Sequence, residues 1–151
     1  DNEKVYFVIG HKMELYEKAI IDISKKLHKK FEIYAIIPKM VSTEEANKLM
    51  DATITGIRIS TENEGLGIYK SFNYEIFERR NSRVIAFDGN SPVSNLIQEA
   101  KNGKGKAKIY VNEENYNLRM KAKTLQGYVI PFKIGDDNII NKILEENNEI
   151  Q

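Results

Sequence analysis

The sequence of 151 residues is long enough for one domain with a single hydrophobic core, and it carries a formal net charge of only +1. This balance gives no overall field toward DNA, RNA or an anionic membrane, so we expect no direct nucleic-acid binding and no membrane association. The lack of cysteine excludes disulfides and thiolate metal sites and suits the cytoplasm, while two histidines are too few for a histidine-rich metal site.

The chain opens with a strand pattern that is followed by a helix pattern. The nearly continuous apolar run Val5–Ile9 stops at Gly10 and predicts a buried strand. The next segment has apolar residues at helical spacing and lysines near its end, where cations suit the helix dipole. The apolar residues of this helix, which we expect to face the core, are Leu15, Ala19, Ile20, Ile23 and Leu27.

Two more strand patterns enclose a short helix. The strands are predicted at 31–37, before Pro38, and at 54–60. Between them, Ser42 is expected to be the N-cap of a helix, with Glu45 at the capping-box position. The expected apolar face of this helix consists of Ala46, Leu49 and Met50.

The second half of the chain continues the alternation and then becomes less regular. Its predicted elements are a helix at 68–80, a strand at 83–87, a helix at 93–100 and a strand at 108–111. After Asn112 the pattern weakens, and 128–132 is expected to be an edge strand because Pro131 is poorly suited to a central one. Apolar residues within 139–144 indicate a final helix.

Strands that alternate with helices imply parallel pairing, because each crossover needs a dozen or more residues. Continuous apolar strands further imply that helices cover both faces of the sheet. We therefore predict an α/β fold of the Rossmann-like, doubly wound type, with a mainly parallel five-stranded sheet that the C-terminal edge strand and helix extend. Residues 1–151 are expected to form one domain, with 112–151 packed on it as an extension.

Polar residues and glycines follow several predicted strands, at the edge of the sheet where ligands bind in such folds. Gly89 would allow a ligand to approach the backbone, and the free amides at the start of the next helix favour phosphate or another anion. The alternative is that Asp88, Asn90 and Ser91 only form the turn and cap that helix. The residues that we expect at the site are Gly10, His11, Lys12, Ser60, Glu62, Asp88, Gly89, Asn90, Ser91 and Ser94.

Other charged residues define no site. The basic residues Arg79, Arg80 and Arg83 are interleaved with acidic ones, and we expect them on a solvated face. The acidic residues that suit glycosidic chemistry are Glu62, Glu75, Asp88 and Glu99. Because a sequence gives no distance between them, no acid–base pair and no catalytic residue are assigned. We expect neither a metal nor a cofactor.

Four short stretches, in a fixed order, resemble one known family. They are Asn73-Tyr74-Glu75, Arg79-Arg80-Asn81-Ser82, the strand and turn from Val84 to Ser91, and Ala100-Lys101-Asn102-Gly103-Lys104. With the opening segment they resemble the SLOG superfamily, which includes the DNA-processing protein A fold and the cytokinin-activating LOG enzymes, and above all its small bacterial members. The resemblance covers about residues 5–111 and implies a Rossmann-like domain that binds or senses a nucleotide or nucleotide-derived signal, with Asn73 at the site.

The same resemblance bears on catalysis. LOG enzymes use a Gly-Gly-x-Gly-Thr-x-x-Glu signature to bind phosphate and to supply a catalytic glutamate. The matching stretch here is Gly89-Asn90-Ser91-Pro92-Val93-Ser94-Asn95, without the later glycines or the glutamate, which favours binding over hydrolysis. A competing resemblance to nucleoside deoxyribosyltransferases implies that a glutamate such as Glu75 or Glu99 cleaves an N-glycosidic bond. Whether the ligand is also cleaved therefore stays open.

Assembly is also an expectation from the family. SLOG relatives commonly pair, which implies a homodimer or another homo-oligomer. Several SLOG domains belong to longer defence proteins, which implies fusion to a partner domain and a role in defence signalling. A first residue other than methionine suits an excised domain of that kind.

Overall fold

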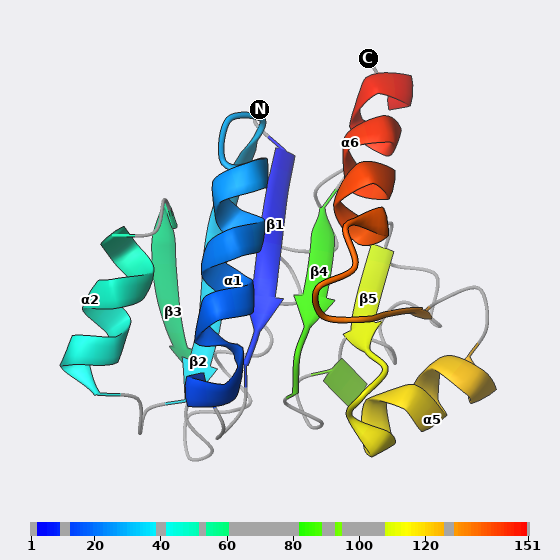
Figure 1. Ribbon diagram of the computed structural model, residues 1–151, viewed down its shortest axis with the longest axis horizontal. Helices are drawn as coiled ribbons and strands as arrows, with labels where there is room; N and C mark the ends of the chain where they lie inside the picture. Colours follow the sequence, from blue (N-terminus) through cyan, green and yellow to red (C-terminus); the bar gives the residue numbers. More distant parts are fainter. Residues whose placement is uncertain are drawn as a thin grey trace.

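The computed structural model describes residues 3–9, 13–38, 42–51, 54–60, 82–88, 93–94, 108–125 and 129–150. Strands and helices alternate over residues 3–60 and again over residues 108–150 (Figure 1). The strands are β1 (Glu3–Val8), β2 (Phe31–Pro38), β3 (Gly56–Ser60), β4 (Arg83–Ala86), β5 (Lys108–Asn112) and β6 (Val129–Phe132). The described helices include α1 (Met13–Leu27), α2 (Thr43–Asp51), α5 (Tyr116–Thr124) and α6 (Asn138–Ile150). Every predicted strand is present, with bounds within two residues of those expected.

The strands form a six-stranded sheet in the order β3-β2-β1-β4-β5-β6. Every pair of neighbours is parallel; Val5 of β1, for example, lies between Ile33 of β2 and Arg83 of β4. The chain winds outward from β1 through β2 and β3, then returns to β4 and winds outward in the other direction. This Rossmann-like order confirms the predicted doubly wound fold, and the expected C-terminal strand is present at the edge.

Pro131 explains why β6 is suited to the edge of the sheet. The Glu113 amide donates to the Phe132 carbonyl at 2.9 Å, so the backbone groups of Phe132 face β5. Because these groups alternate in direction along a strand, the backbone of Pro131 faces away from β5. A missing N–H on that side breaks no bond to β5, and the predicted edge position is confirmed.

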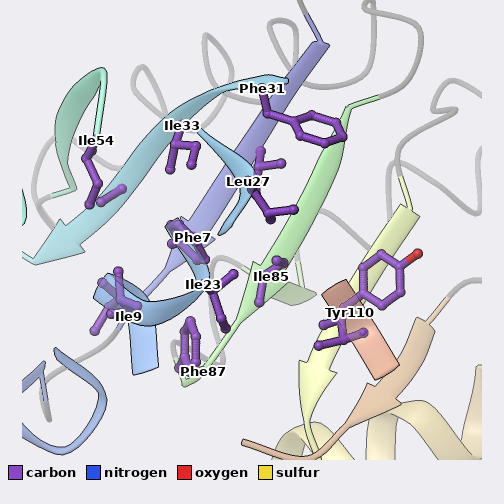
Figure 2. Packing of buried hydrophobic residues seen from close by; sticks show 14 of the residues in the cluster. Phe7, Ile9, Ile23, Leu27, Phe31, Ile33, Ile54, Ile85, Phe87 and Tyr110 are labelled. Carbon is purple, nitrogen blue, oxygen red and sulfur yellow. The ribbon is translucent and has the colours of Figure 1, made fainter. Parts of the chain in front are cut away.

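Apolar side chains cover both faces of the sheet. Neighbouring residues of β1 belong to different cores, since Phe7 lies in one cluster and Tyr6 in the other. The Phe7 cluster includes residues of α1, α2 and α6, and Figure 2 shows part of it. The Tyr6 cluster includes Leu118 and Ala122 of α5. Helices therefore pack on both faces, as continuous apolar strands require.

The predicted start of α2 is confirmed. The hydroxyl oxygen of Ser42 accepts a hydrogen bond from the Glu45 amide at 3.2 Å, which satisfies one of the free amides of the first turn. The Ser42 hydroxyl also donates to Oε1 of Glu45 at 3.3 Å. The glutamate side chain thus contacts the capping hydroxyl, whereas in a full capping box it bonds to the backbone of the cap residue.

Three predictions about exposure are wrong. Leu15 of α1 and Met50 of α2 were expected in the core, but they are 64% and 44% exposed. In α1 the apolar stripe is centred on Ile20 and continues to Tyr16 one turn earlier, which rotates Leu15 outward. Arg83 was expected on a solvated face, but it is 1% exposed. Arg83 begins β4, which lies between β1 and β5 in the sheet. The interior position of this strand decides the burial of Arg83, although a charged residue is usually exposed.

Candidate functional site

The carboxyl ends of β1 and β4 lie side by side, where the strand order reverses (Figure 1). The backbone stays paired just beyond β4, because the Phe87 amide donates to the Val8 carbonyl at 3.0 Å. On the other side of β1, the Ile9 amide donates to the Ile36 carbonyl at 3.0 Å. Doubly wound folds bind ligands in the crevice outside this point. Asp88 is the first polar residue after β4 and therefore lies at the crevice position.

Asn112 links the end of β5 to the end of β4. Its side chain is fully buried, and Nδ2 donates to the Phe87 carbonyl oxygen at 3.2 Å. The Oδ1 atom accepts from the backbone amide of Glu114 at 3.1 Å. One buried amide thus satisfies backbone groups of two segments and fixes the chain directly before Asp88. Asp88 is itself only 8% exposed.

Tyr16, in the first turn of α1, brings a phenol to the same place. Its ring packs against the ring of Phe87, with centroids 5.6 Å apart. Burial raises the pKa of the Tyr16 phenol above its ordinary value of 10.0, and the negative charges of Asp88 and Glu114 raise this pKa further. A hydrogen bond with the side chain of Asn112 acts in the opposite direction. The phenol is therefore protonated at physiological pH and available as a donor.

We call Tyr16, Asp88, Asn112 and Glu114 the strand-end cluster. They come from α1, from the end of β4 and from the end of β5 with the turn after it. The cluster combines a phenol, which donates and accepts hydrogen bonds, with two carboxylates, which accept them. Chemically, this arrangement suits a ligand group that has hydrogen-bond donors and no negative charge.

The structure brings one of the described sequence-predicted site residues, Asp88, into this cluster. Ser60 is the last residue of β3, so it lies on the same side of the sheet as the carboxyl ends of β1 and β4. However, β2 and β1 lie between β3 and β4, which places β3 about 14 Å from β4 at the usual strand spacing. Ser94 is exposed in a helical segment, beside the buried Val93. The expected site residues that lie outside the described part of the chain are Gly10, His11, Lys12, Glu62, Asn73, Gly89, Asn90 and Ser91.

The sequence analysis missed Tyr16, Asn112 and Glu114. Asn112 had a usable signal, because it is a polar residue directly after the predicted strand 108–111, as Asp88 is directly after the predicted strand 83–87. Tyr16 had none, since it falls within the helical stripe and an aromatic residue there indicates core packing. Glu114 enters the cluster through the turn after β5, whose shape depends on Asn112.

Two further properties concern only the residues that the structure describes. None of their helices has both the length and the apolar character needed to cross a bilayer. They also contain no group of three or more His, Cys, Asp or Glu side chains arranged to hold a metal ion.

Comparison of the chain with protein-family models, curated proteins and solved structures returned no match. The Rossmann-like class is therefore assigned from the strand order and the two-sided core.

The position of Tyr16 predicts its titration. The ultraviolet absorbance of phenolate is measured against pH in the wild type and in Tyr16→Phe, and the difference between the two curves reports Tyr16. This difference is expected to show a pKa above 10.0 in the folded protein. Because the folded protein holds this proton more tightly than the unfolded chain, the contribution of Tyr16 to folding stability is complete below about pH 10 and is lost as the pH rises through the folded-state pKa. Asp88→Asn is expected to lower the pKa of Tyr16 without restoring its ordinary value, since burial remains.

The control for this titration is Tyr116→Phe, which removes a phenol from a residue that is 64% exposed. Its effect on absorbance should not depend on the residue at position 88. A Tyr16 phenol that titrates at or below pH 10.0 would contradict the described environment.

Proposed function

We propose that this chain is a SLOG-type domain that binds a nucleotide or a nucleotide-derived signal where β1 and β4 end. The observation that carries the proposal is the position of Asp88, a carboxylate residue only 8% exposed at the reversal of strand order. Doubly wound folds bind ligands where the strand order reverses, so a carboxylate at this position supports a role in binding a ligand. The SLOG-like order of sequence motifs supports a nucleotide as the ligand.

We favour binding over cleavage because the segment after Asp88 lacks the glycines and the glutamate of the LOG signature. Cleavage of an N-glycosidic bond, by a phosphoribohydrolase-like or deoxyribosyltransferase-like reaction, is the alternative. Glu75 and Glu99, which the sequence suggests for it, lie outside the described residues. The lack of cysteine supports a cytoplasmic protein, which we propose acts as a homo-oligomer or beside a fused partner domain.

A thermal-shift panel of nucleotides and cyclic nucleotide derivatives tests the function. A ligand at about 100 times its Kd is expected to stabilise the folded state by about 2.7 kcal/mol, which raises the Tm of a domain of this size by roughly 5 to 10 °C. Chromatography of the same mixtures after prolonged incubation detects any free base or ribose phosphate. A shift without such products is the expected result.

The matched variants are Asp88→Asn, which is expected to reduce the shift strongly, and Asp51→Asn, which replaces an exposed aspartate at the end of α2 and should leave it unchanged. If no member of the panel shifts the Tm, the binding proposal is wrong. Products that disappear in Glu75→Gln or Glu99→Gln would instead establish an enzyme. A shift that is identical in Asp88→Asn would place the ligand elsewhere on the fold.

A further inference from the structure

We propose that the strand-end cluster binds the ribose hydroxyls of the ligand, with Asp88 as their acceptor and Tyr16 as a donor to them. This inference rests on the proposed function and names the part of the ligand that this side of the site recognises. It differs from the expectation drawn from the sequence, in which the turn after β4 holds a phosphate or another anion.

The charges of the described side chains oppose a phosphate here. Asp88 and Glu114 both act on the phenol of Tyr16 as negative charges. The backbone of Glu114 is held to Asn112 at 3.1 Å, and Asn112 in turn is held at 3.2 Å to Phe87, the residue before Asp88. Glu113, the neighbour of Glu114, forms an ion pair with Lys133 at 3.7 Å. A phosphate beside two carboxylates would be repelled, whereas a neutral sugar would not.

The hydrogen-bonding groups suit a diol. An ionised carboxylate only accepts hydrogen bonds, and its two oxygens accept well from two neighbouring hydroxyls. Dinucleotide-binding Rossmann domains bind ribose with an acidic residue on a different strand, which shows that the chemistry is sufficient. The Tyr16 phenol adds a group that can both donate to a hydroxyl oxygen and accept from a hydroxyl.

The cluster is also held in place before any ligand arrives. The ring of Tyr16 packs against Phe87, and Asp88 follows Phe87 directly in the chain, so both residues that would touch the sugar adjoin the same buried residue. The Phe87 carbonyl is itself held by the side chain of Asn112. Asn112 uses its oxygen on the amide of Glu114 and its nitrogen on Phe87. It is therefore a positioning residue. Prior placement of this kind lowers the cost of ordering side chains when a ligand binds.

The test compares pairs of ligands that differ only in the sugar. Isothermal titration calorimetry would use ribonucleoside monophosphates and their 2′,3′-dideoxy counterparts. The wild-type protein is expected to bind the ribose form at least about tenfold more tightly, the usual worth of a hydrogen bond to a charged group. Asp88→Asn and Tyr16→Phe should each reduce this preference while they leave the affinity for the dideoxy form nearly unchanged.

Tyr34→Phe is the matched control, because it removes a phenol from β2, in the middle of the strand and away from the strand ends. Equal binding of the ribose and dideoxy forms by the wild type would overturn the sugar inference and leave the proposed function intact. So would a preference that survives in both Asp88→Asn and Tyr16→Phe. The ligand comparison needs no mutation, so a variant that fails to fold does not prevent the test. If no nucleotide binds at all, the proposed function is wrong and the inference falls with it.

Discussion

Replacing Asn112 with aspartate is expected to cost about 3 to 5 kcal/mol of folding stability near neutral pH. The change is nearly isosteric, but the aspartate would place a fully buried carboxylate where Nδ2 now donates to the Phe87 carbonyl at 3.2 Å. The position would lose a donor and gain an acceptor that faces another acceptor. Because Asp88 and Glu114 lie close by, two further negative charges would oppose ionisation.

The pH dependence gives this prediction its sign. Burial and the neighbouring carboxylates would raise the folded-state pKa of the new carboxyl above its unfolded value of about 3.9. The folded variant would therefore hold a proton more tightly than the unfolded chain, and the penalty should be small at or below about pH 4 and grow as the pH rises. Urea denaturation at acidic and neutral pH measures the difference.

Asn115→Asp provides a matched control for Asn112→Asp. Asn115 caps α5 by accepting a hydrogen bond from the Leu118 amide at 3.1 Å, and it is partly exposed. Aspartate caps helices as well as asparagine does and also suits the helix dipole, so this change should alter stability by less than about 0.5 kcal/mol. Equal effects of the two substitutions would contradict the bridging role of Asn112.

Removal of the Phe87 ring is expected to cost about 3 to 5 kcal/mol, which is a large share of the stability of an ordinary domain. The residue is fully buried, and its ring contacts those of Phe7, Tyr16 and Phe132 at centroid distances of 5.9, 5.6 and 5.7 Å. These contacts join β1, α1 and β6 to the end of β4. Phe87→Ala would open a cavity below the candidate site.

The measurement for Phe87→Ala is the free energy of unfolding by linear extrapolation from urea. The control is Leu15→Ala, which also truncates a large apolar side chain but at a position that is 64% exposed. It should change the free energy of unfolding by no more than about 0.5 kcal/mol. A cost below about 1 kcal/mol for Phe87→Ala would show that the aromatic contacts are not a centre of the core.

Much of the fold could be predicted because its strands are buried on both faces. A continuous apolar run such as Val5–Ile9 is a strong local signal, and the segments between strands are long enough to require parallel crossovers. The helix α5 was missed because only Leu118 and Ala122 of its nine residues are buried. Two apolar anchors one turn apart give too little periodicity to distinguish a helix from a loop.

The candidate site was predictable only in part, because its residues meet through the strand order. Asp88 was found from its position after an apolar strand, since that rule needs no partner. Its neighbours Tyr16 and Asn112 lie far from it in sequence, and no local pattern relates them. The adjacency of β1 with β4 and of β4 with β5 brings them together. The chemistry of the cluster therefore depends on pairings that a single sequence does not encode locally.

The central place of β1 has a consequence for the order in which the protein folds. One edge of β1 pairs with β2, but the other must wait for β4, which lies at residues 83–86. While the chain is being synthesised, β1, β2 and β3 can assemble first and expose one apolar, unpaired strand edge. Long-range parallel pairing of this kind is slow, so refolding is expected to be limited by the docking of β4 on β1. The unfinished chain is therefore most open to aggregation along the strand that later lies beside the candidate site.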